Sequence, residues 1–265
     1  MSMGGNFADL RMRVISAIVL VIVGVAAIWA GSWVFLVLVS LVAGLMLWEL
    51  VNMLDHDLAP AKAILLAVVG GAAVFRTGYD VSPLALASIL LAPVLGMVLL
   101  RKDRGIFAVY GLILLFAVAG LFWIRTGAGL DWTIWLVATV IATDIGGYFF
   151  GRILGGPKIL PAISPKKTWS GTVGGWMLAA LVSLGFVITY GAPVIVIAIG
   201  IVTAIASQAG DVAESAIKRH SGVKDASNLI PGHGGFLDRF DALIAASLFL
   251  MLLGVLKGLP PLGGL

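Results

Sequence analysis

The chain is a succession of long apolar stretches separated by short polar breaks. We predict nine spans, at 14–30, 33–54, 62–76, 82–100, 106–124, 131–151, 169–190, 192–213 and 240–257. About 20 apolar residues cross a bilayer as a helix, so the stretch 62–76 is the weakest of them. The stretches are solidly apolar and do not alternate, which argues against a β-barrel. The pattern predicts an all-α polytopic membrane bundle of about nine transmembrane helices.

The composition supports a single integral membrane domain over residues 1–265. The chain is 61% hydrophobic and 11% charged, whereas soluble domains are about half apolar and a quarter charged. We expect an apolar helical scaffold over 1–130, and catalytic helices and loops over 131–257. Arg11 and Arg13 precede the first stretch as in a signal peptide, but the eight later stretches favour a retained span. The absence of cysteine excludes disulfides, thiolate metal sites and cysteine nucleophiles.

The basic residues predict the orientation of the chain. With a cytoplasmic N-terminus, all but three of the 17 Lys and Arg residues fall on the cytoplasmic side, and the exceptions are Arg76, Arg125 and Lys257. This asymmetry follows the positive-inside rule and explains the net charge of +4 without a nucleic-acid partner. The division depends on nine spans, because losing one would move basic loops across the membrane. The two long loops, 152–168 and 214–239, are then cytoplasmic, and long loops on a rigid scaffold often carry chemistry.

Four polar motifs stand out from the apolar background. They are Ser215-x-x-Lys218-Arg219 with Lys224-Asp225 and Pro231-Gly-His233-Gly234-Gly235-x-x-Asp238-Arg239-x-Asp241; Gly210-Asp211-x-x-Glu214; Asp144-x-x-x-Tyr148-x-x-Gly151-Arg152; and Ser164-Pro-Lys166-Lys167-Thr168-x-Ser170-Gly171. Together they resemble the signature of the phosphatidate cytidylyltransferase family. The resemblance is close over residues 140–245, whereas the first 130 residues are similar only in being apolar spans. Ser170 stands where the family usually has Glu, which puts a role for that carboxylate in doubt.

The resemblance implies a reaction in which a phosphatidate oxygen attacks the α-phosphorus of CTP, giving CDP-diacylglycerol and pyrophosphate. It implies a bacterial inner-membrane enzyme with a cytoplasm-facing active site, with CTP, phosphatidic acid and membrane lipids as partners; a homodimer is left open. The catalytic residues would be Lys218, Arg219, Lys224, Asp225, His233 and Arg239. Substrate would be bound by Ser215, Lys166, Lys167, Gly234 and Gly235. Mg²⁺, with a second cation left open, would be held by Asp144, Asp211, Asp238 and Asp241.

The residues themselves point the same way. On a helix, Asp211, Glu214, Ser215 and Lys218 share one face. The four aspartates come from three predicted spans and would converge near one membrane depth, where carboxylates are tolerated mainly when paired or metal-bound. Structural alternatives stay open: a helix-packing hydrogen bond for Asp144, a salt bridge from Asp211 to Lys218 or Arg219, and capping of the last span by Asp238 and Asp241. The Gly-His-Gly-Gly segment suits close approach to a phosphate, or simply a tight turn.

Two other functions fit parts of the pattern. A CTP-dependent polyprenol kinase would share many features, but the complete motif around Pro231–Asp241 argues against it. A transporter of an anionic solute would place its charges near the midplane, whereas these cluster at one face. No Walker A sequence is present, so a P-loop nucleotide site is not supported.

Overall fold

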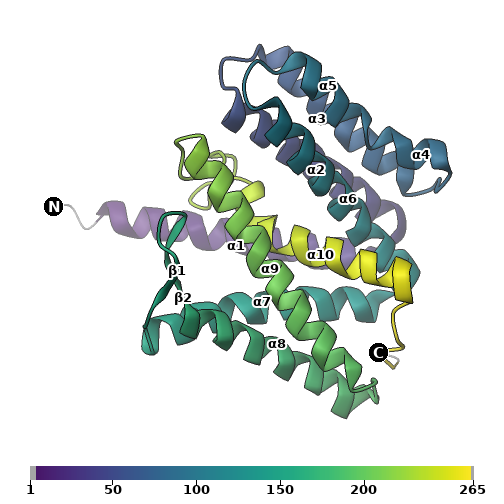
Figure 1. The fold of residues 1–265 in the computed structure, drawn as a ribbon, viewed down its shortest axis with the longest axis vertical. Helices are drawn as coiled ribbons and strands as arrows, with labels where there is room; N and C mark the ends of the chain where they lie inside the picture. Colours follow the sequence, from purple (N-terminus) through teal and green to yellow (C-terminus); the bar gives the residue numbers. More distant parts are fainter. Residues whose placement is uncertain (1–3, 264–265) are drawn as a thin grey trace. The chain divides into compact units, whose positions relative to one another are not determined.

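The computed structural model describes the backbone of residues 4–263 and the side chains of residues 11–263, and it is almost entirely helical (Figure 1). The helices are α1 (Gly4–Ala30), α2 (Ser32–Leu54), α3 (Pro60–Thr77), α4 (Pro83–Ser88), α5 (Leu91–Leu99), α6 (Arg104–Trp123), α7 (Leu130–Ile153), α8 (Trp169–Tyr190), α9 (Ile195–His220) and α10 (Leu237–Lys257). A π-helical turn, η1 (Ile124–Ala128), follows α6. The predicted all-α fold class is confirmed.

In the described part of the chain, eight helices are long and apolar enough to cross a membrane. The weakest predicted span, 62–76, extends to Pro60–Thr77 because Pro60 begins the helix, where a proline needs no hydrogen-bond partner. The predicted span 82–100 is different: it consists of the two short helices α4 and α5. Ser82 caps α4 by accepting a hydrogen bond from the Ala85 amide at 3.3 Å. Hydropathy alone does not reveal this break.

The chain forms two compact units. Unit 1 comprises the described residues up to Phe122 together with His220–Phe240, and unit 2 comprises Trp123–Arg219 together with the described residues from Asp241 onward. The boundaries fall close to helix ends, near the end of α6, the end of α9 and the start of α10. Each unit is described by itself.

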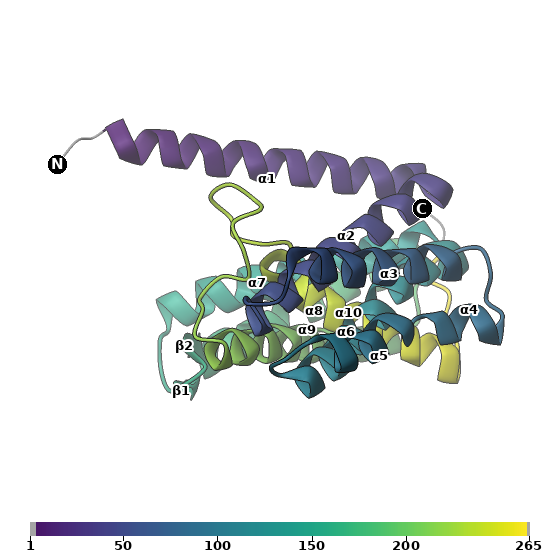
Figure 2. The same ribbon diagram turned by 90° about the horizontal axis from the view of Figure 1, so that it is seen from above.

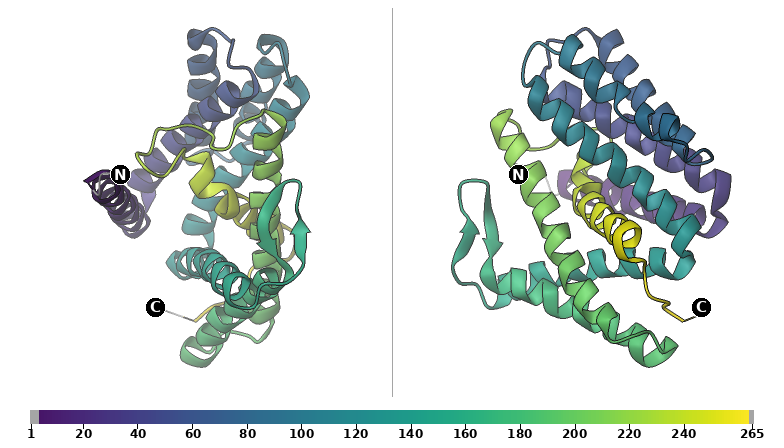
Figure 3. Two further views of the ribbon diagram at one scale, coloured as in Figure 1. Left: turned by 90° about the vertical axis from the view of Figure 1, so that its left-hand side faces the viewer. Right: turned by 45° about the vertical axis from the view of Figure 1, so that its right-hand side comes forward.

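Unit 1 is built around α2, α3, α5 and α6 (Figures 1 and 3). Small residues bring these helices close together, as is typical of membrane helix packing. A β carbon on Gly71 of α3 would lie 2.8 Å from the carbonyl oxygen of Ser40 in α2. A β carbon on Gly96 of α5 would collide with the ring of Phe107 in α6. Side chains larger than glycine at these positions would force the helix pairs apart.

Three connecting segments of unit 1 meet at one end. Asp55, after α2, accepts a hydrogen bond from the Arg101 amide at 2.6 Å, and the Lys102 ammonium lies 3.1 Å from Asp57. This ammonium holds the pKa of the Asp57 carboxyl below its usual range by hydrogen bonding to it. His220 ends α9 and precedes the loop 221–236, called the signature loop below; it lies 2.9 Å from Asp103. The chain therefore leaves this end along α3 and returns to it along α4 and α5.

Unit 2 is built on α7 and α8, which pack along each other. A β carbon on Gly146 of α7 would lie 2.6 Å from the Gly174 carbonyl oxygen of α8, so only a residue without a side chain fits there. Between these helices the chain forms an antiparallel hairpin of β1 (Lys158–Leu160) and β2 (Ser164–Thr168) (Figure 3). The sequence did not predict this hairpin. Thr168 ends it and caps α8 by accepting from the Gly171 amide at 3.2 Å.

Candidate active site

The predicted site residues divide between the two units. Unit 1 holds Lys224, Asp225, His233, Gly234, Gly235, Asp238 and Arg239, whereas unit 2 holds Asp144, Lys166, Lys167, Asp211, Ser215, Lys218, Arg219 and Asp241. Five residues of the first set line a cavity in unit 1, and Asp144, Lys166, Lys167 and Asp211 of the second set line a cavity in unit 2. The other predicted residues lie outside these two linings.

The cavity of unit 1 gathers residues that are far apart in the sequence. It has a volume of about 450 Å³ and is lined by Arg13, Lys224, Asp225, Asn228, Gly232, His233, Gly234 and Arg239. Five of these were predicted as site residues. Three permanent cations face a single carboxylate, which makes this an anion-binding environment. The buried Nδ1 of His233 has no hydrogen-bond partner among the described residues, so it is available to a ligand.

The signature loop builds this cavity with a tight turn. Ile230 donates its amide to the Gly234 carbonyl at 2.8 Å, and His233 donates its amide to the Ile230 carbonyl at 2.9 Å. Gly232 and Gly234 have φ of 75° and 82°, a region that side chains other than glycine rarely adopt. The tight turn, which the sequence left open as a structural alternative, is present. Whether its amides also bind phosphate stays a prediction.

Helix α1 is tied to the same loop. Ser16 donates its hydroxyl to the Pro231 carbonyl at 3.0 Å, and Figure 2 shows the loop reaching toward α1. A β carbon on Gly232 would lie 2.6 Å from Cγ of Arg13, so the turn and this side chain are in close contact. The sequence assigned Arg13 only to the positive-inside count. Its place in the anion-binding cavity was missed.

Asp238 holds the loop against the start of α10. One of its carboxylate oxygens, Oδ2, accepts hydrogen bonds from the Ala226 amide at 2.9 Å and from the Gly235 amide at 2.8 Å. A β carbon on Gly234 would lie 2.7 Å from this oxygen. These contacts match the structural alternative, a capping role, which can coexist with metal binding. The metal-ligand role of Asp238 stays a prediction.

Glu49 of α2 is a second carboxylate at this helix start, and the sequence analysis missed it. Its side chain is fully buried and accepts hydrogen bonds from the amides of Phe236 at 2.9 Å and Leu237 at 2.7 Å. It also accepts from the Ser227 hydroxyl at 2.6 Å. Glu49 therefore satisfies amides that the first turn of α10 leaves unpaired. The available signal was a lone carboxylate within a predicted span.

The cavity of unit 2 combines carboxylates with cations. It has a volume of about 470 Å³ and its charged lining residues are Asp144, Arg152, Lys166, Lys167 and Asp211. The Lys167 ammonium lies 2.6 Å from Oδ2 of Asp211, which links the end of the hairpin to α9. This is a partner that the sequence did not suggest.

The predicted polar face of α9 is present. Ser215 donates its hydroxyl to Oδ1 of Asp211 at 3.2 Å, and Lys218 forms an ion pair with the buried Glu214 one turn earlier. These contacts confirm that the four residues lie together on the helix. Lys218 is thus held in place by its own helix, and its role toward substrate stays a prediction.

The carboxylates of unit 2 suit a metal ion that arrives with a nucleotide. Gly210 brings α9 close to the Asp241 backbone of α10, since a β carbon on Gly210 would lie 2.6 Å from the Asp241 carbonyl oxygen. Among the described residues, no three His, Asp or Glu side chains form a group that could hold a metal by themselves. Mg²⁺ usually binds through one or two carboxylates plus substrate phosphates. Asp144 and Asp211 fit that mode.

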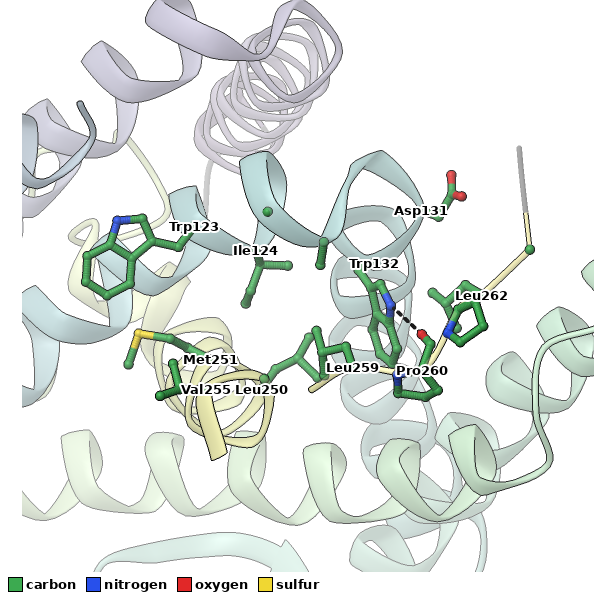
Figure 4. Close-up of a pocket in the computed structure, with 15 residues that line it drawn as sticks. Trp123, Ile124, Asp131, Trp132, Leu250, Met251, Val255, Leu259, Pro260 and Leu262 are labelled. Atoms are coloured by element: carbon green, nitrogen blue, oxygen red, sulfur yellow. Dashed lines mark hydrogen bonds between the residues drawn. The ribbon is translucent and has the colours of Figure 1, made fainter. Parts of the chain in front are cut away.

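A third cavity, also in unit 2, contains none of the predicted residues. It has a volume of about 550 Å³ and lies between η1, the end of α10 and residues 259–263 (Figure 4). The Trp132 indole donates to the Pro260 carbonyl at 3.1 Å, which fastens the segment after α10. Asp131 is its single charged lining residue. Its walls lack the groups that phosphate chemistry needs.

Comparison with known families decides between the alternatives. Residues 11–256 match the model of the family described as "Cytidylyltransferase family". The chain belongs to the cytidylyltransferase family. A phosphatidate cytidylyltransferase of Bacillus subtilis is 30% identical over 92% of the chain and 97% of its own length. That of Staphylococcus saprophyticus is 32% identical over 89% of the chain and 95% of its own length.

A higher identity is confined to part of the chain. A phosphatidate cytidylyltransferase of Brucella suis is 46% identical over 140 residues, which is 50% of the chain and 50% of that protein. The matched segment therefore spans about half the length of this relative. These matches confirm the predicted resemblance of the chain to this family.

One departure from the family pattern now has a structural description. Ser170 stands at the position that is usually Glu, and its hydroxyl donates to the Gly155 carbonyl before the hairpin. It also lies 3.1 Å from the Thr168 hydroxyl. In this chain the position fastens the base of the hairpin without a charge.

Proposed function

We propose that the chain is a CTP:phosphatidate cytidylyltransferase of the bacterial inner membrane, with its active site facing the cytoplasm. The observation that carries this proposal is the cavity of unit 1, where five signature residues meet around an anion-binding space. Membership of the family, and the names of relatives that match nearly the whole chain, support it.

The cavity of unit 1 suits the phosphate of phosphatidate. A phosphate monoester carries about −1.5 to −2 charges at neutral pH, and Arg13, Lys224 and Arg239 offset them. Arginine can donate two parallel hydrogen bonds to a phosphate. The unpartnered Nδ1 of His233 provides a further contact. These groups orient the phosphate oxygen that attacks CTP.

The cavity of unit 2 suits the triphosphate of CTP. Lys166 and Lys167 neutralise phosphate charge, while Asp144 and Asp211 would hold Mg²⁺. Mg²⁺ bound there would neutralise the triphosphate and stabilise the departing pyrophosphate. Asp241 would lie in or just behind the same set of ligands, and Ser215 would keep Asp211 oriented through its hydrogen bond.

The reaction needs no covalent intermediate. A phosphatidate oxygen forms a bond to the α-phosphorus of CTP, the bond to the bridging oxygen breaks, and pyrophosphate leaves with that electron pair. Such chemistry depends mainly on positioning and electrostatic stabilisation, which fits a site made of cations, carboxylates and a glycine turn.

The decisive experiment uses purified protein with CTP labelled at the α-phosphorus, phosphatidate and Mg²⁺. We expect label in CDP-diacylglycerol and one pyrophosphate released for each lipid formed. A lipid kinase would instead release labelled CDP when given polyprenol, and a transporter would form neither product. Either of these results would overturn the proposal.

A further inference from the structure

Unit 1 also contains an apolar groove between α2 and α3. The groove has a volume of about 690 Å³, and apolar side chains make up nearly all of its lining, from Val37 and Phe75 at one end to Trp48 and Leu229 at the other. Trp48 follows Val37 by eleven positions in α2, which corresponds to about 16 Å along the helix axis. Gly44 and Gly71, where the two helices are in close contact, and Ala72 line the groove with little or no side chain. The groove is therefore long, narrow and apolar.

The signature loop joins this groove to the anion-binding cavity of the same unit. Asn228 lines the cavity, and the next residue, Leu229, lines the groove. The hydrogen bond from Ser227 to Glu49 ties the loop to α2 at 2.6 Å, and the Leu229 amide donates to the Ser227 hydroxyl at 3.1 Å. Trp48, which lines the groove, directly precedes Glu49 in α2. Two adjacent loop residues thus line the anion-binding cavity and the apolar groove.

We infer that this groove between α2 and α3 receives one acyl chain of the lipid whose phosphate lies in the unit 1 cavity. The inference rests on the proposed function, because it takes the lipid to be phosphatidate. A charged head beside an apolar channel is the chemistry of a phospholipid, and it does not fit a free nucleotide or inorganic phosphate. Lipid tails are as apolar as the groove, so the groove contributes little to affinity by itself. Its contribution is to fix where the head group lies and to distinguish lipids by chain.

The test fills the groove and compares lipids of different chain length. Ala72 is exposed in the groove, so Ala72→Phe narrows it without entering the helix packing. With dipalmitoyl phosphatidate we expect KM to rise about three- to tenfold, in keeping with the cost of overpacking. With dihexanoyl phosphatidate, KM and kcat should stay unchanged, as should KM for CTP. Val98→Phe is the matched control, because Val98 of α5 is 73% exposed and apolar but lies outside the groove.

A second measurement does not depend on turnover. Phosphatidate with a photoreactive diazirine at the end of one acyl chain should label wild-type peptides from α2 and α3, and Ala72→Phe should reduce this labelling while Val98→Phe does not. Equal labelling of α5 and the groove, or equal KM changes in both variants, would overturn the inference. If Ala72→Phe fails to fold, the labelling pattern of the wild type decides. Wild-type protein that converts neither dihexanoyl nor dipalmitoyl phosphatidate would instead count against the proposed function.

Discussion

The carboxylate of Asp211 is shared between an ammonium and a hydroxyl. Lys167 contacts one of its oxygens and Ser215 the other, so the side chain is held in a fixed orientation on α9. A metal ion that binds here with CTP would meet a carboxylate that needs little reorganisation. That arrangement makes Asp211 the most informative of the predicted ligands.

Asp211→Asn keeps the size of the side chain and removes the charge. We expect kcat to fall by about a hundredfold or more, as when a transition-state electrostatic contact is lost, and the Mg²⁺ concentration for half-maximal rate to rise. Initial rates across a Mg²⁺ titration measure both. Asp57→Asn is the control, since Asp57 is exposed and pairs with Lys102 outside both cavities. An unchanged Mg²⁺ dependence in Asp211→Asn would remove this residue from the metal site.

Arg239 offers a test of the anion-binding cavity of unit 1. A hydrogen bond to a charged group contributes about 1.5–3 kcal/mol, so Arg239→Ala should raise KM for phosphatidate about ten- to a hundredfold. KM for CTP should change much less. Steady-state kinetics with each substrate varied in turn measure this split, and Lys158→Ala in the hairpin controls for loss of a surface cation. A rise confined to the KM for CTP would contradict the assignment of this cavity to phosphatidate.

At the scale of residues, the sequence predicted the local motifs far better than their distant partners. Lys224, Asp225, His233, Gly234 and Arg239 lie within one short segment, so their spacing was visible. Glu49 and Arg13 reach the same segment from helices about 180 and 220 residues earlier. No local pattern records such a contact. A lone carboxylate in a span was the single clue to Glu49, and Arg13 was already explained by membrane topology.

Among the elements, the start of α10 depends on close contact between a glycine and a buried carboxylate. A β carbon on Gly235 would lie 2.5 Å from Oε1 of Glu49 and 2.9 Å from its Oε2. These oxygens accept from the first amides of the helix, so they cannot move away without losing hydrogen bonds. Gly235 is therefore a structural requirement for this cap, whatever its contact with substrate.

Gly235→Ala should destabilise unit 1 by about 1–3 kcal/mol, the usual cost of overpacking. Thermal unfolding in detergent, followed by tryptophan fluorescence, should show a lower Tm. Gly105→Ala is the matched control, because a β carbon there meets nothing within 4 Å and alanine favours the helix. Equal Tm values for the two variants would show that the Glu49 carboxylate can shift to make room for a β carbon without loss of stability. The close contact at this cap would then not be a structural requirement.

The break between α4 and α5 shows why one predicted span differed. Residues 82–100 read as one apolar run, and hydropathy carries no information on where a helix begins. At the break itself, the amides of Ile89 and Leu90 donate to the carbonyls three residues earlier, at 3.2 and 3.0 Å. At the start of α4, Asp80 and Ser82 form a capping cluster, in which the Ser82 amide and hydroxyl each donate to Asp80 at 2.9 Å. These hydrogen bonds hold the pKa of the Asp80 carboxyl below its usual range. The two short helices still return the chain to the end it left along α3, as one predicted span over 82–100 would.

For the whole molecule, this return of the chain along α4 and α5 is what relates the structure to the predicted orientation. Asp57 and Lys102 flank the path formed by α3, α4 and α5, and they form an ion pair. They must therefore lie on the same side of the membrane, as the basic-residue distribution requires. If α4 and α5 did not complete a crossing, every later loop would change sides and the basic excess would be lost.

The lack of cysteine allows this topology to be tested one position at a time. Single cysteines at Asp57, Lys102 and Lys158 should react with a membrane-impermeant maleimide only after intact spheroplasts are permeabilised. Cysteines at Tyr79 and Val194, which are 62% and 71% exposed, should react without permeabilisation. Activity of each variant on labelled CTP confirms that it is folded. Labelling of the Lys158→Cys variant in intact spheroplasts would place the hairpin on the periplasmic side. The Lys167–Asp211 ion pair, which is attached to the hairpin, would then lie on the side that cytoplasmic CTP does not reach. That result would contradict both the orientation and the proposed active site, whereas opposite labelling of Asp57 and Lys102 would contradict the path of α4 and α5 alone.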